Sequence, residues 1–107
     1  MTAPSDQFQL FILDIIDLDV VIGRFFGGRK LEYNGVQFAI LMGNTLYLRI
    51  AESDHEKFES YGSTPFSYAT KRRRVVVKKY YSVPEAWLDD PELLRHWVQE
   101  TLSSSEN

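Results

Sequence analysis

Catalysis needs a nucleophile beside a base or a cluster of metal ligands, and this 107-residue chain has few suitable residues. The chain has no cysteine, which excludes disulfides and thiolate metal sites. Its two histidines, His55 and His96, have charged neighbours and lack the spacing of a metal-binding pair. No Gly-x-Ser-x-Gly motif presents a serine, and Asp89-Asp90 precedes Pro91, where helix capping is the better interpretation. We therefore expect no catalytic residue, no metal and no cofactor.

The glycine pair Gly27-Gly28 is a candidate phosphate-binding loop. Such a loop lies between a strand and a helix, so that backbone N–H groups and the helix N-terminus meet the anion. Here "RKLEY" and then Asn34-Gly35 follow, so the next element is expected to be a strand, and no Gly-Lys-Ser/Thr occurs. We favour a tight corner at which the glycines supply positive φ angles.

Arg24 interrupts an apolar run between Gly23 and Phe25-Phe26. It could bind an anion or a protein partner, or it could pair with a carboxylate such as Glu32 at the sheet margin. The ion pair is favoured, because charged residues in apolar surroundings are usually paired. A pocket that converges on Arg24 would instead indicate a small ligand bound under the sheet.

Half of the twelve Lys and Arg residues fall in one expected β-hairpin: Lys71, Arg72, Arg73, Arg74, Lys78 and Lys79. They could contact phosphates, with Tyr80 and Tyr81 nearby to stack on bases. We favour a solvated tip whose charges discourage edge pairing, with both tyrosines packed in the domain. Strict alternation cannot turn Lys78 and Lys79 outward together, so their joint exposure would require a β-bulge.

Three helices are predicted to support the sheet. Ser5 can cap a helix from about Asp6 to Leu18, in which Phe8, Phe11, Ile12, Ile15 and Ile16 form one apolar stripe. "SDHE", from Ser53 to Glu56, is a capping box for a short helix that ends at Gly62. Asp90 caps a final helix with Pro91 in its first turn and with one apolar face, formed by Leu94, Trp97, Val98 and Leu102.

Six strands are predicted: Val20–Phe26, Lys30–Tyr33, Val36–Met42, Thr45–Ile50, Phe66–Thr70 and Val75–Val83. Turn residues separate the first four into an antiparallel meander, and Asn34-Gly35 suits a type I′ turn. Leu46, Leu48 and Ile50 alternate with outward residues in the fourth strand. The fold class is α+β, an antiparallel sheet with flanking helices in the order α-β-β-β-β-α-β-β-α.

Composition indicates one globular domain, residues 1–107, with disordered ends at 1–5 and 103–107. A net charge of −3 argues mildly against non-specific nucleic-acid binding by the whole surface. The first residues lack the pattern of a signal peptide, and no apolar run approaches the roughly 20 residues of a membrane span. The lack of cysteine suits a reducing cytosol.

The stretches "RFFGGRKLEYNGVQFAILMGNTLYLRI", "YGSTPFSY" and "YYSVPEAWLDDPELLRHW" resemble the amino-terminal domain of the TfoX/Sxy competence regulators. The resemblance runs in order from about Phe8 to Leu102. Phe25 replaces the family's methionine, and Arg29-Lys30 replace an aromatic residue and a glycine. The matching residues are Arg24, Phe26, Gly27, Gly28, Phe38, Ala39, Tyr47, Leu48, Pro65, Phe66, Tyr80, Tyr81, Val83 and Pro84.

The resemblance implies a cytoplasmic bacterial protein of the competence-regulator type. Full-length members join this domain to a carboxy-terminal helical domain and act as co-activators with the cyclic-AMP receptor protein at competence promoters. The element order is similar to that of the secretion-chaperone fold, whose members dimerise, so a homodimer is expected by fold-level analogy.

We therefore expect a non-enzymatic regulatory module that contacts a protein of the transcription machinery. The residues expected to bind the partner are Arg24, Phe26, Gly27, Gly28, Tyr80 and Tyr81. The expected charged contact patch is Lys71, Arg72, Arg73, Arg74, Lys78 and Lys79. The alternative is a module that binds nucleic acid directly through the hairpin residues Lys71–Lys79.

Overall fold

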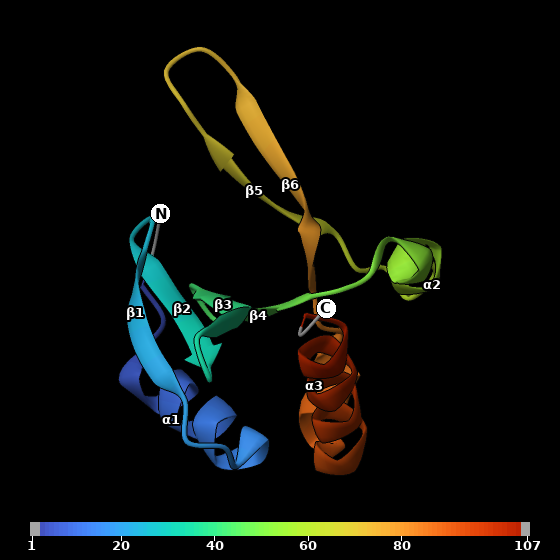
Figure 1. Ribbon diagram of the computed structural model, residues 1–107. Coiled ribbons are helices and arrows are strands. Elements are labelled where there is room, and N and C mark those ends of the chain that lie inside the picture. Colours follow the sequence, from blue (N-terminus) through green and yellow to red (C-terminus); the bar gives the residue numbers. More distant parts are fainter. Residues whose placement is uncertain (1–2, 106–107) are drawn as a thin grey trace.

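A six-stranded antiparallel sheet with helices against it forms the domain, and the computed structural model describes residues 3–105 (Figure 1). The strand order is β1-β2-β3-β4-β6-β5. The predicted α+β class and element order are confirmed. The elements are α1 (Asp6–Ile16), β1 (Val21–Phe25), β2 (Gly28–Tyr33), β3 (Val36–Met42), β4 (Thr45–Arg49), α2 (His55–Ser60), β5 (Pro65–Ala69), β6 (Arg74–Ser82) and α3 (Pro91–Ser105), with 3₁₀ turns at Glu52–Asp54 and Glu85–Asp89.

The first helix begins as predicted and ends earlier. The Ser5 hydroxyl accepts a hydrogen bond from the Phe8 N–H at 3.1 Å, which is the expected cap. The helix stops at Ile16 because Asp17 adopts a left-handed φ of 52° and donates its N–H to the Leu13 carbonyl. The predicted stripe is too wide, because Phe11 lies at its edge and is 45% exposed.

The predicted capping box of the second helix is wrong. Ser53 lies inside the 3₁₀ turn, and α2 begins at His55 with no side-chain cap bond from Asp54. The end of α2 is as predicted, because Gly62 has a φ of 84° and its N–H reaches the Glu59 carbonyl at 3.0 Å.

The final helix is capped where the sequence predicts. The Asp90 carboxylate accepts from the Leu93 N–H at 3.3 Å, and the four apolar residues of the predicted face are all buried. The helix continues to Ser105, since no Gly or Pro after Leu102 stops it. Residues 103–105 of the expected disordered end are therefore helical, whereas residues 1–2 and 106–107 lie outside the described residues.

Helices α1 and α3 pack against one face of the sheet and enclose the main core (Figure 1). Alternation along β3 and β4 turns Leu41, Leu46 and Leu48 toward these helices, and Phe38, the unpaired residue of a bulge in β3, joins the same core. Phe58 of α2 joins the core through edge-on contacts with Trp87 and Trp97, at ring distances of 5.4 and 5.0 Å. Within residues 3–105 no helix has the length and apolar character needed to cross a membrane.

Candidate protein-interaction surface

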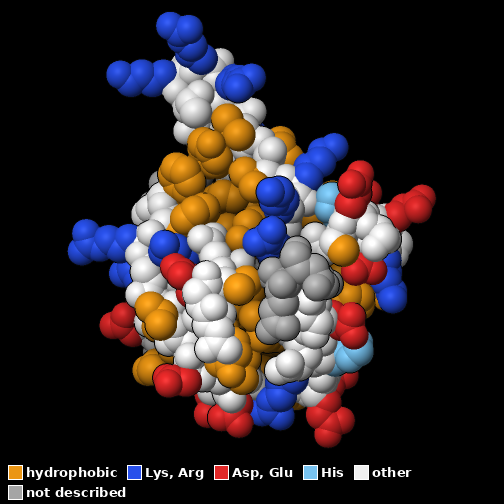
Figure 2. All heavy atoms as spheres, viewed as in Figure 1, with side chains coloured by type: hydrophobic (Ala, Val, Ile, Leu, Met, Phe, Trp, Pro, Cys, Tyr) orange, Lys and Arg blue, Asp and Glu red, His pale blue; other side chains and the backbone are white. Residues whose placement is uncertain are grey.

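The face of the sheet turned away from α1 and α3 carries a second apolar cluster, which we call the aromatic face. Its described members all come from strands, so no helix covers it among these residues. Figure 2 shows hydrophobic side chains gathered at the base of the projecting β5–β6 hairpin. The members are the buried Ile40, Phe66 and Tyr80 and the partly buried Phe25, Met42, Tyr47, Tyr68 and Val77.

The sheet curls until rings from its two edges touch. β1 and β5 are opposite edge strands, yet Phe26, directly after β1, stacks on Tyr68 of β5 at a centroid distance of 4.6 Å. Phe25 and Phe66 lie 6.0 Å apart beside them. Offset contacts of this kind add to the stabilisation that burial provides. The aromatic face is therefore concave, and these ring contacts hold the edge strands β1 and β5 in place relative to each other.

The corner between β1 and β2 is a two-residue turn. Phe26 and Gly27 have φ angles of 48° and 84°, so Gly27 supplies the predicted positive φ and a strand follows it. The same prediction is wrong for Gly28, which lies within β2. Gly28 is needed for space instead, because a Cβ there would collide with the Leu41 carbonyl oxygen and the Met42 side chain.

Phe26 combines two properties that are unusual for an aromatic residue. A left-handed φ is rare for bulky side chains and costs free energy that the surroundings must offset. The turn nevertheless presents a ring that is 53% exposed beside the aromatic face. Phe26 is therefore the most accessible ring of this surface.

The predicted ion pair between Arg24 and Glu32 is wrong. Glu32 lies opposite Val21 in the β1–β2 register, so alternation places Arg24 on the other face of the sheet. Glu32 pairs with Lys30, two residues away on its own strand, at 2.9 Å. Arg24 is exposed opposite Arg29 and lines neither of the grooves described below, so the structure does not support a ligand under the sheet at Arg24.

The tip of the β5–β6 hairpin presents a basic loop, Lys71–Arg74, whose four side chains are exposed (Figure 2). Thr70 closes this loop. Its N–H and its hydroxyl both donate to the Arg73 carbonyl, at 2.8 and 2.9 Å, and its hydroxyl oxygen accepts from the N–H groups of Arg72 and Arg73. The loop backbone is thus ordered while its charges face water.

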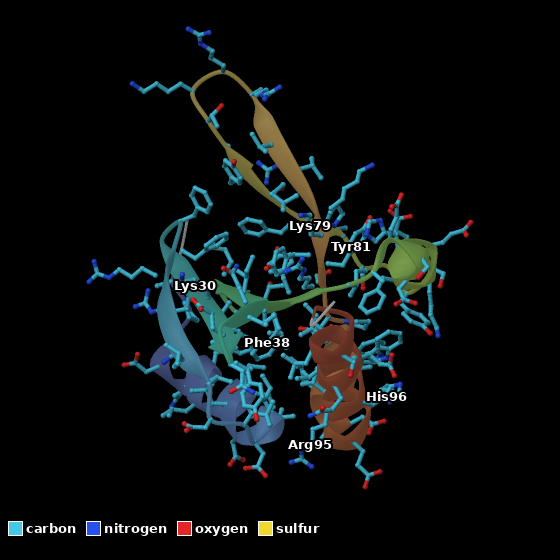
Figure 3. All side chains as sticks on the ribbon, in the orientation of Figure 1. Lys30, Phe38, Lys79, Tyr81, Arg95 and His96 are labelled. Atoms are coloured by element: carbon cyan, nitrogen blue, oxygen red, sulfur yellow. The ribbon has the colours of Figure 1, made fainter. Side chains whose placement is uncertain are left out.

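Lys78 and Lys79 lie within a β-bulge of β6. Val77 pairs with Phe66, but Tyr81 pairs with the adjacent Pro65, so β6 has extra residues at this point. Lys78 and Lys79 are both exposed, as the bulge requires. Lys79 lies near the middle of β6, away from the basic loop at the hairpin tip (Figure 3), and Lys78 directly precedes it. The six cations therefore form two separate groups.

The two adjacent tyrosines are buried in different clusters. Tyr80 belongs to the aromatic face and donates its hydroxyl to the Gln37 carbonyl at 3.3 Å. Tyr81 belongs to the main core and donates to the Glu59 carboxylate at 2.8 Å. Burial raises the pKa of each. Both rings are packed, as favoured from the sequence, so neither presents a free face for base stacking.

A groove of about 370 Å³ lies where the β3–β4 turn meets β5 and β6. Tyr47 and Tyr68 of the aromatic face line it together with Arg74 of the basic loop. A partner side chain could therefore meet aromatic rings and a guanidinium in one place. Sequence reasoning missed Tyr68, although its spacing of two from Phe66 on one strand places both on the same face.

Metal binding has no candidate in the part of the chain that the structure describes, where no group of three or more His, Asp or Glu residues is gathered. The ring centroids of His55 and Tyr81 lie 4.8 Å apart. The Nε2 atom of His96 lies 4.0 Å from a carboxylate oxygen of Glu100, and both of these side chains are exposed. These contacts explain both histidines as packing or surface residues.

Residues 18–105 match the family model described as TfoX N-terminal domain, which covers nearly the whole chain. No curated protein matches the sequence.

Proposed function

Because the chain belongs to the TfoX N-terminal domain family, we propose that it is a non-enzymatic regulatory module that contacts a protein of the transcription machinery in the cytoplasm. Co-activation at competence promoters, which the resemblance to competence regulators implies, would depend on such a contact. The partner docks on the aromatic face and on the ring of Phe26 that stacks on Tyr68 at its rim.

The exposed aromatic rim of the sheet carries this proposal. Phe26 is 53% exposed and stacks on Tyr68 beside strands that no described helix covers. Aromatic residues that remain accessible on a fixed concave surface are typical of protein-binding sites. The left-handed φ of Phe26 supports the same interpretation, because strained residues gather at functional sites.

Charge at the hairpin indicates the chemistry of the partner. The basic loop adjoins the aromatic face, and Arg74 lines the groove beside Tyr47 and Tyr68. Positive charge next to an apolar surface complements a partner that carries acidic and apolar side chains together. The partner segment would place an aromatic or aliphatic side chain in the groove and a carboxylate near Arg74.

Affinity capture from a nuclease-treated extract of the cells that encode the protein tests the proposal. Phe26→Ala removes the exposed ring, and Tyr61→Ala removes a ring that is 49% exposed elsewhere. We expect wild type and Tyr61→Ala to recover the same transcription protein, and Phe26→Ala to recover about tenfold less. Equal recovery by all three would overturn the proposal.

Direct binding to nucleic acid is the second candidate function. The observation that favours it is the basic loop, in which Thr70 orders the backbone while Lys71–Arg74 are exposed. Such a loop could contact phosphates without reading a sequence.

A further inference from the structure

A second groove, of about 550 Å³, lies at the opposite end of the hairpin from the basic loop. It is formed where β4 ends, where the 3₁₀ turn Glu52–Asp54 leads into α2, and where β6 bulges. Its volume falls in the range of small-ligand sites, about 300–1,000 Å³. We call it the bulge groove. Its polar lining residues are Arg49, Glu52, His55, Lys78, Lys79 and Thr101.

The bulge groove is positively charged. Its lining carries three cations, Arg49, Lys78 and Lys79, and only one carboxylate, that of Glu52. Among residues 3–105, none of the three cations has a carboxylate within ion-pair distance. Three cations that share a concave wall attract an anion, and the arginine can bind two phosphate oxygens through its planar fork.

Fixed backbone holds these cations in place. The Lys79 carbonyl accepts from the Ile50 N–H at 2.9 Å, and the Arg49 carbonyl accepts from the Thr101 hydroxyl at 2.5 Å. A regular strand would turn only one of Lys78 and Lys79 outward, whereas the bulge exposes both. Bulges are frequent beside binding sites, where they redirect a side chain. Here the bulge doubles the positive charge that β6 gives to the groove.

We propose that the bulge groove binds a small phosphorylated ligand of mononucleotide size. Arg49, Lys78 and Lys79 bind the phosphate. The Glu52 carboxylate would repel a phosphate, but it suits hydroxyl or amino donors on the rest of the ligand. His55, whose ring lies 4.8 Å from that of Tyr81, adds a ring nitrogen to the same wall. A phosphate joined to hydrogen-bond donors describes a nucleoside monophosphate.

An NMR titration of the ¹⁵N-labelled full chain tests this site, with AMP, inorganic phosphate and adenosine as separate probes. We expect AMP to produce saturating shifts at the amides of Arg49, Ile50, Lys78 and Lys79. Its affinity should be at least about tenfold higher than that of phosphate, and adenosine should produce no shifts. Equal affinity for AMP and phosphate would overturn the assignment of a nucleotide-sized ligand.

Two matched variants distinguish specific binding of AMP in the bulge groove from general electrostatic attraction of AMP to the cations of the protein. Lys78→Ala/Lys79→Ala removes two exposed cations from the groove, and Lys71→Ala/Arg72→Ala removes two from the basic loop. We expect the first to weaken AMP binding by at least about tenfold and the second to leave it within about twofold. Equal weakening by both, or shifts that never saturate, would overturn the proposal. All four side chains are exposed, so the variants should retain dispersed spectra.

Discussion

The ring of Phe26 stacks on that of Tyr68 at 4.6 Å and 16°, although the two residues come from opposite edges of the sheet. This contact joins the β1–β2 turn to the β5–β6 hairpin across the concave aromatic face. The surface proposed for the partner therefore depends on contacts between elements that are distant in sequence.

A double-mutant cycle should measure this coupling. Phe26→Ala and Tyr68→Ala each remove one ring, and the loss in the double variant should be smaller than the sum by about 0.5–1.5 kcal/mol. Urea unfolding of the four proteins gives the coupling free energy. A cycle between Tyr61→Ala and Tyr68→Ala is the control, and a coupling no larger than in that control would contradict the stacked geometry.

The two kinds of glycine should respond differently to alanine. Gly28→Ala places a Cβ against the Leu41 carbonyl oxygen and should lower the free energy of unfolding by about 1–3 kcal/mol. Gly35→Ala meets open space at a φ of 79° and should cost about 1 kcal/mol, from backbone strain alone. Denaturant unfolding ranks the two variants. A larger loss of stability in Gly35→Ala than in Gly28→Ala would contradict the close approach of the Leu41 carbonyl oxygen to position 28.

Much of the local structure could be predicted because neighbouring residues determine it. The Ser5 and Asp90 caps and the Asn34-Gly35 turn, where φ is 52° and 79°, depend on side chains and dihedrals within a few positions. The bulge at Lys78-Lys79 was also indicated, since strict alternation cannot turn two adjacent lysines outward together.

The failures concern how distant segments meet. The ion pair between Arg24 and Glu32 is excluded by the β1–β2 register, which composition does not reveal. Ser53 loses its cap because the chain enters α2 through a 3₁₀ turn. Likewise, the contact between Phe26 and Tyr68 follows from the curl of the sheet, which brings its two edge strands together. The aromatic face and its contact with Phe26 could therefore be predicted only in part from the sequence.

Alkaline pH should destabilise the fold through its buried tyrosines. Burial first, and then the hydrogen bond and charge of Glu59, raise the pKa of Tyr81 above its ordinary value of 10.0. Between the unfolded and folded pKa values, the unfolded chain releases this proton while the folded chain retains it. The stability contribution is therefore complete below about pH 10 and is lost as pH rises through the folded pKa.

Urea unfolding at about pH 8 and about pH 11 checks this dependence. Tyr81→Phe removes the ionisable hydroxyl, so it should lose less stability over this interval than wild type. Tyr61→Phe changes an exposed tyrosine and serves as the control. A Tyr81→Phe variant that loses as much stability as wild type would contradict the role of this hydroxyl.

The protein-contact account predicts no saturable binding to duplex DNA at about 200 mM salt. Fluorescence anisotropy of a labelled duplex at about 50 mM and about 200 mM salt measures this, beside a Lys71/Arg72/Arg73/Arg74→Ala variant. Steep salt dependence in wild type, together with loss of binding in the variant, would instead favour the nucleic-acid function of the basic loop.

In-cell photo-crosslinking tests the central claim most directly. A photoreactive phenylalanine in place of Phe26 or Tyr68 samples the aromatic face, and the same residue in place of Tyr61 samples an exposed aromatic position outside it. We predict a discrete nuclease-resistant adduct with one transcription protein from the first two positions and none from the third. Adducts of equal yield from all three positions, or no protein adduct from Phe26 and Tyr68, would contradict the account.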